Sequence, residues 1–168
     1  VLSAEMRDAA QPPTLARDFE AAAARYRSWA SDYLANRRAA RLDAADIAGT
    51  EWPMFGSVFF LLSAQELAKS HGVAITGSTL EAVRLAAEVV ADPATSSWVQ
   101  RRWGSAYLER EDVFYRMLLV LGLTSYESLT HDARHAAALR AQTESLTREL
   151  LTAPFHLADD YPGGCYPN

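Results

Sequence analysis

The stretch MFGSVFFLL, at residues 54–62, decides the fold class of this chain. It leaves almost no polar face, and a helix without a polar face lies buried on most of its sides. A second run of the same kind, VFYRMLLVL, stands at residues 113–121. We therefore expect two buried helices, over about residues 53–71 and 112–129, with Gly72 ending the first of them.

Helices of a different character separate the buried ones. Apolar residues recur every three or four positions in three segments, which predicts amphipathic helices. These segments cover about residues 14–41 and 78–91, and a third from His131 to just before Pro154. Gly49-Thr50 is expected to break the helical pattern after the first segment. A short helix is expected over about residues 95–105. No stretch alternates with a period of two, so the sequence predicts an all-α chain without a sheet.

The buried helices also begin alike, which indicates a repeat. An acid, an aromatic residue and proline occur as EWP at residues 51–53 and as DYP at residues 160–162, with a looser version at Asp112. These starts imply a helical hairpin repeated every 50 to 60 residues or so. Buried inner helices alternating with amphipathic outer ones predict about half of an α/α toroid, formed by residues 14–168 behind an N-terminal arm at residues 1–13. An open-ended α-solenoid is the alternative.

Composition excludes several classes of protein. The 168 residues carry a net charge of −5, and their 16 Lys and Arg residues are mixed with acids, so no basic surface for nucleic acid is expected. No apolar run reaches the roughly 18 residues that a membrane span needs. The single cysteine excludes an internal disulfide and leaves the cellular compartment open.

Cys165 is the first candidate for chemistry. It follows Gly163-Gly164 at what should be the start of a third buried helix. A helix N-terminus lowers the pKa of a thiol, and small neighbours allow a substrate to approach closely. The alternative is a buried, inert cysteine.

Two carboxylates are candidates for proton transfer. Glu51 and Asp160 begin buried helices at equivalent places, and Asp112 begins the intermediate one. In a toroid these N-terminal ends face the central cavity, where helix dipoles favour carboxylates. Carboxylates perform acid–base catalysis when their surroundings separate their pKa values. Alternatively, these residues only satisfy backbone N–H groups in the first helical turns.

Aromatic residues and one arginine are the candidates for substrate binding: Trp52, Tyr115, Tyr161, Tyr166 and Arg116. The aromatic residues either face the cavity or belong to the core. Arg116 interrupts an apolar run, so it either binds an anionic substrate or pairs with a carboxylate of an inner helix. His131 and His135 lack a clear third ligand, and no phosphate-binding loop or serine elbow occurs. Neither a metal site nor a cofactor is expected.

Residues 113–132 together with DYPGGCY at residues 160–166 resemble the linalool dehydratase/isomerase family. Those enzymes are (α/α)6 toroids whose central cavity is lined by a carboxylate, tyrosines, a histidine and cysteines. The resemblance implies that Cys165 corresponds to the first active-site cysteine of the family. It implies also that the family's histidine falls near Arg116, a departure from the family pattern, and that the second cysteine lies beyond Asn168.

The sequence thus predicts a lyase- or isomerase-like enzyme acting on a small organic substrate. Cys165 would act as nucleophile or acid/base, and Asp160 and Glu51 would transfer protons. Two alternatives stay open. One is a carbohydrate-active toroid, whether hydrolase, lyase or epimerase, that uses carboxylates only, and the other is a helical-repeat binding module without chemistry.

A partner is also expected. Two inner helices and the start of a third cannot close a ring, and their apolar faces would meet water. We therefore expect a second polypeptide, the continuation of this chain, to complete the toroid. Cleavage after Asn168, by cyclisation of its side chain or by a protease, would produce the two chains, and so would separate genes.

Overall fold

The computed structural model describes residues 12–43, 46–110 and 114–153. Within these ranges every regular element is a helix, so the prediction of an all-α chain is confirmed for the part described. The longer helices are α2 (Pro12–Ala35), α3 (Ile47–His71), α4 (Gly77–Ala91), α7 (Phe114–Thr130) and α8 (Ala136–Thr152). The short elements between them are η1 (Arg38–Arg41), η2 (Pro93–Ser96), α5 (Ser97–Trp103), α6 (Tyr107–Arg110) and η3 (Ala133–His135).

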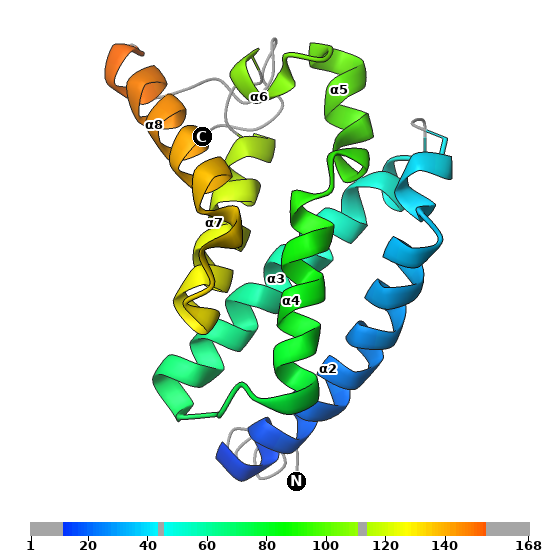
Figure 1. The fold of residues 1–168 in the computed structure, drawn as a ribbon, viewed down its shortest axis with the longest axis vertical. Helices are drawn as coiled ribbons and strands as arrows, with labels where there is room; N and C mark the ends of the chain where they lie inside the picture. The colour runs from blue at the N-terminus through cyan, green and yellow to red at the C-terminus, as the bar shows by residue number, and fades with distance from the viewer. Residues whose placement is uncertain (1–11, 44–45, 111–113, 154–168) are drawn as a thin grey trace, which may run out of the picture.

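The longer helices form two layers. In Figure 1, α3 and α7 run in the same direction, whereas α2, α4 and α8 run the opposite way. Helix α3 packs along α7, α4 packs on α2, α3 and α7, and α8 packs on α7. Helices α3 and α7 therefore make one layer, and α2, α4 and α8 make the other.

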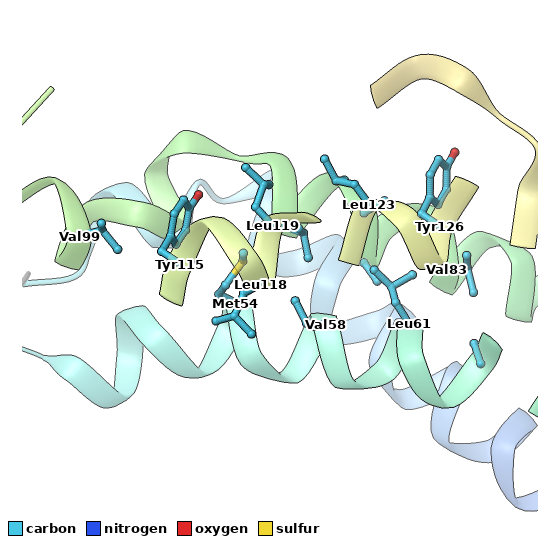
Figure 2. Close-up of a cluster of buried hydrophobic side chains, with 14 of the residues drawn as sticks. Met54, Val58, Leu61, Val83, Val99, Tyr115, Leu118, Leu119, Leu123 and Tyr126 are labelled. Atoms are coloured by element: carbon cyan, nitrogen blue, oxygen red, sulfur yellow. The ribbon is translucent and has the colours of Figure 1, made fainter. Parts of the chain in front are cut away.

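The contact between α3 and α7 is the centre of the core. Met54, Val58 and Leu61 point from α3 toward α7, where they face Leu118 and Leu123 (Figure 2). All five side chains are buried. The apolar runs that predicted buried helices thus pack mainly on each other and on α4.

Gly122 allows three helices to meet closely. It lies on α7 at the point where α3 and α4 both approach. A Cβ atom at this position would stand 3.1 Å from Cγ1 of Val90 on α4 and 3.3 Å from Cγ2 of Val58 on α3. Such separations are shorter than ordinary van der Waals contact, so only glycine fits here without movement of its neighbours.

Aromatic rings join α2 to α3. Tyr26 stacks on Phe60 with ring centroids 4.4 Å apart, and Phe19 also stacks on Phe60, with ring centroids 5.5 Å apart. Trp29 continues the row, 5.4 Å from Tyr26 and 5.0 Å from Tyr33. The apolar stripe predicted on the first amphipathic helix is therefore largely a row of stacked aromatic side chains. We call these five residues the aromatic row.

Three predicted helix ends were wrong. Helix α8 begins at Ala136 rather than at His131, since His131 adopts a left-handed conformation (φ 54°) and η3 precedes α8. Helix α3 begins at Ile47 rather than near Pro53, because the carboxylate of Asp46 caps it by accepting a hydrogen bond from the backbone N–H of Gly49 (2.9 Å). Gly49 is thus part of a helix, and Pro53 lies in its second turn. Helix α2 ends at Ala35 instead of continuing to residue 41, since Arg37 adopts a left-handed conformation (φ 48°) and η1 follows it.

Other predicted ends were confirmed. Gly72 ends α3 with φ 65°, and its N–H bonds to the carbonyl of Leu67. Helix α4 ends at Ala91, and α8 ends at Thr152. Among the described helices, none combines the length and apolar character needed to cross a membrane.

Candidate functional site

One face of the α3–α7 layer lies opposite α4 and carries exposed apolar side chains. We call it the inner face. On α3 it contains Trp52, which is 64% exposed, and Phe59, which is 53% exposed. On α7 it contains Met117 and Leu121, each 38% exposed. Exposed apolar groups collected on two neighbouring helices indicate a surface that binds something.

Helical spacing explains why these residues share a face. Positions 52, 56, 59, 63 and 66 follow one side of α3, and positions 117, 121, 124 and 128 follow one side of α7. The members nearer the C-terminal ends are polar and exposed: Ser63, Glu66, Thr124 and Ser128. The inner face is thus apolar beside the N-terminal ends of both helices and polar beside their C-terminal ends.

Glu51 lies at the apolar end of this face, in the first turns of α3. Its side chain is half-buried, and this burial raises the pKa of the carboxyl group above its ordinary value of 4.5. Trp52 follows it, with its ring 5.9 Å from Phe55. A carboxyl group with a raised pKa beside an apolar surface is suited to hold and transfer a proton.

Tyr115 is part of the core and is not on the inner face. It is 2% exposed, and its ring packs edge-on against Trp98 of α5 (5.9 Å) and Tyr107 of α6 (5.6 Å). The short helices α5 and α6 therefore cover the start of α7 and hold this tyrosine. Of the two sequence alternatives for the aromatic residues, the structure gives Tyr115 a core position.

Arg116 is fully buried and points toward α8. Its Nη1 donates a hydrogen bond to Glu149 Oε2 (2.6 Å), Nη2 donates to Ser145 Oγ (2.7 Å), and Nε donates to Gln142 Oε1 (3.1 Å). The expected ion pair is present. Glu149, the carboxylate of this pair, lies on the amphipathic helix α8, and a pairing of Arg116 with a carboxylate of an inner helix stays a prediction.

The remaining predicted site residues lie outside the described ranges. They are Cys165, Asp160, Tyr161, Tyr166, Asn168 and the weaker candidate Asp112. Of the predicted site residues that the structure describes, it brings Glu51 and Trp52 together at the apolar end of the inner face, and it separates Tyr115 and Arg116 from that face.

A cleft lies between α2 and the start of α3, on the other side of Trp52. Its volume is about 490 Å³. Aromatic side chains form much of its wall, with one arginine and one aspartate. The lining residues are Tyr26, Trp29, Tyr33, Arg38, Leu42, Asp46, Gly49, Trp52, Pro53 and Gly56.

Sequence reasoning missed most of this cleft. It took Tyr26, Trp29 and Tyr33 only as one apolar stripe, although two hydroxyl groups and an indole N–H on a core stripe are a signal of polar function. The polar partners of Arg116 also had a signal. Gln142, Ser145 and Glu149 follow one side of a helix at spacings of three and four residues.

A second polar cluster joins α4 to the connection between α7 and α8. The hydroxyl of Tyr126 donates a hydrogen bond to Asp132 (2.8 Å), and Arg134 binds both Asp132 (2.8 Å) and Glu88 of α4 (3.0 Å). The hydrogen bond from Tyr126 is the main cause that lowers the pKa of Asp132. This cluster fastens the connection between α7 and α8 to α4, so we assign it a structural role.

Within the described residues no group of three or more His, Cys, Asp or Glu side chains is arranged to hold a metal ion. Comparison of the chain with protein-family models, with curated proteins and with solved structures gave no match. The function must therefore be inferred from the inner face, from the α2–α3 cleft and from the chemistry of the sequence.

Proposed function

We propose that this chain forms part of an α/α toroid enzyme of lyase or isomerase type, related to the linalool dehydratase/isomerase family. In this proposal the inner face is a wall of the central cavity, and the substrate is a small organic molecule with apolar character. The observation that carries the proposal is the exposed apolar patch of Trp52, Phe59, Met117 and Leu121 beside the N-terminal ends of two parallel helices.

The two-layer arrangement supports a ring. In an α/α toroid, parallel inner helices stand side by side around the centre, and antiparallel outer helices cover their backs. Helices α3 and α7 have the relation of inner neighbours, and α2, α4 and α8 have that of outer helices. Further hairpins of the same kind, supplied by the continuation of this chain as a second polypeptide or within one precursor, would cover the exposed apolar side chains.

Chemistry in this cavity would depend on groups at the N-terminal ends of the inner helices. Glu51, with its raised pKa, is suited to act as a proton donor or acceptor. Cys165 and Asp160 would supply the nucleophile or a second acid/base, and Tyr161 and Tyr166 would position the substrate beside Trp52. Cleavage after Asn168 belongs to this proposal as the step that separates the two polypeptides.

Thiol labelling tests the catalytic part. Iodoacetamide should label Cys165 in the native protein at pH values well below the ordinary thiol pKa of about 8.5. Cys165→Ser should keep the fold, as followed by circular dichroism, and should abolish turnover. Labelling with an ordinary pH dependence would refute a catalytic thiol and would favour the carbohydrate-active toroid that uses carboxylates only.

Lysine substitutions test the ring. Phe59→Lys places a charge on the inner face, whereas Leu151→Lys changes an apolar residue on α8 that is 66% exposed, more than the 53% of Phe59. Native mass spectrometry should find the chain bound to its continuation in the wild type and in Leu151→Lys, and largely separated from it in Phe59→Lys. Equal behaviour of the two variants would contradict the toroid.

A further inference from the structure

The α2–α3 cleft has the features of a second ligand site; it shares Trp52 and Gly56 with the inner face, but Phe59, Met117 and Leu121 do not line it. Its volume of about 490 Å³ lies within the range of small-molecule pockets, roughly 300 to 1,000 Å³. Tyr26 and Trp29 line it from α2, and Trp52 lines it from α3. Flat aromatic walls of this kind select a ligand that carries a flat ring.

Tyr33 carries an unused hydrogen-bond donor in the wall of this cleft. The residue is 3% exposed, and its hydroxyl group is buried without a hydrogen-bond partner among the described residues. A buried hydroxyl that lacks a partner is costly, so an acceptor from a ligand or a bound water is expected here. Burial raises the pKa of Tyr33 to about 12, which keeps the group protonated and able to donate.

Arg38 lines the cleft and can offer its charge to an anion, although Asp46 also lines the cleft and the charge of Asp92 acts on Tyr33. Among the described residues, Arg38 makes a long ion pair with Asp32 (3.5 Å), in which both side chains are about half exposed. Such a pair is weak in water and can exchange its partner. The carboxylate of Asp46 is already engaged by the N–H of Gly49 at the start of α3, where the helix dipole balances its charge.

We propose that the α2–α3 cleft binds a small organic anion, with a flat ring against Trp29 and Trp52 and a carboxylate that accepts hydrogen bonds from Arg38 and Tyr33. A cation of the same shape is disfavoured, because it would meet the guanidinium group of Arg38 and would leave the Tyr33 hydroxyl without an acceptor. The proposal does not depend on the toroid, since the cleft is formed by α2, η1, α3 and the residues Leu42 and Asp46 between η1 and α3.

Three probes of one shape test the charge preference: sodium 2-naphthoate, 2-naphthylmethanol and 2-naphthylmethylammonium. Isothermal titration of the full chain should find naphthoate bound about tenfold more tightly than the alcohol, as expected for one charge-assisted hydrogen bond. The ammonium probe should bind more weakly than the alcohol. Tighter binding of the ammonium probe, or binding of none of the three at millimolar concentration, would overturn the proposal.

Substitutions of single residues test which side chains of the cleft bind the probes. Arg38→Gln should remove the preference for naphthoate over the alcohol, whereas Arg41→Gln, an exposed arginine of the same turn that does not line the cleft, should leave it unchanged. Trp52→Ala should weaken all three probes. Phe59→Lys should leave naphthoate binding unchanged, because Phe59 does not line the cleft, and this separates failure here from failure of the toroid. Equal effects of Arg38→Gln and Arg41→Gln would refute the site.

Tyr33→Phe separates a ligand from an ordered water. If the partner is the ligand carboxylate, this variant should weaken naphthoate binding severalfold and should leave the unfolding midpoint of the free protein unchanged or raised. If a bound water supplies the partner, the midpoint should fall and naphthoate binding should not change, which would refute the assignment of Tyr33. Tyr26→Phe is the matched control for stability, because the Tyr26 hydroxyl is hydrogen-bonded to Ser57 (2.6 Å), and it should lower the midpoint.

Discussion

Two glycines inside helices should respond to alanine in opposite ways. At Gly56, on the exposed side of α3, an added Cβ meets nothing within 4 Å, so Gly56→Ala should gain the helix propensity of alanine, about 0.5–1 kcal/mol. At Gly122 the same gain is opposed by contacts of 3.1 Å with Val90 and 3.3 Å with Val58. Overpacking of this kind costs roughly 1–3 kcal/mol. Gly122→Ala should therefore be less stable than Gly56→Ala by about 1–3 kcal/mol.

Urea unfolding followed by circular dichroism measures both changes. A third variant identifies the cause. In a Val90→Ala background the close contact at position 122 is largely removed, so Gly122→Ala should there stabilise the protein nearly as much as Gly56→Ala does. If Gly122→Ala is as stabilising as Gly56→Ala in the wild-type background, the close junction of α3, α4 and α7 is not present in solution.

Three further predictions concern charged groups. Glu149→Gln removes a carboxylate that is paired with the fully buried Arg116. It should cost about 2 kcal/mol, less than the roughly 3–5 kcal/mol of a fully buried pair, because Glu149 is 35% exposed. An unchanged urea midpoint would contradict this pairing. The folded-state pKa of Asp132 is lowered, so the stability that its carboxylate contributes is present above the ordinary pKa of 3.8 and is lost as pH falls through the folded-state pKa. Tyr126→Phe should therefore reduce the loss of stability in acid, as measured by urea midpoints between pH 2 and 6. The pKa of Glu51 is raised, so the stability contributed by its protonated form is present below pH 4.5 and is lost as pH rises. Glu51→Gln should therefore be more stable than the wild type near pH 7 and equally stable near pH 3. A gain in stability at both pH values would argue against burial as the cause of the raised pKa.

The helices and their burial could be predicted because they depend on local patterns. The runs at residues 54–62 and 113–121 are apolar on most sides, and Met54, Val58, Leu61, Leu118 and Leu119 from them are buried in the core. Gly72 ends a helix through its own conformational freedom, which is visible in the sequence. In such cases the physical cause lies within a few neighbouring residues.

Other features depend on which elements meet, and sequence patterns do not specify that. Arg37 ends α2 in a left-handed conformation although neither glycine nor proline marks the place. Pro53 suggested a helix start, but the cap at Asp46 places the start earlier. The need of Arg116 for a carboxylate was predictable, whereas the helix that supplies it was not. The α2–α3 cleft lies between two helices and the residues that connect them, so no local pattern predicts it. The roles of Cys165 and Asp160 remain predictions.

The central position of α4 has a consequence for synthesis on the ribosome. Helices α2 and α3 contact each other mainly through the long side chains of the aromatic row, whereas each packs closely on α4. A nascent chain that has emerged only as far as Gly72 therefore carries two helices whose apolar sides still face water. Stable tertiary structure should first form when Ala91 has left the exit tunnel, so chaperone binding should be strongest for arrested chains that expose α2 and α3 without α4.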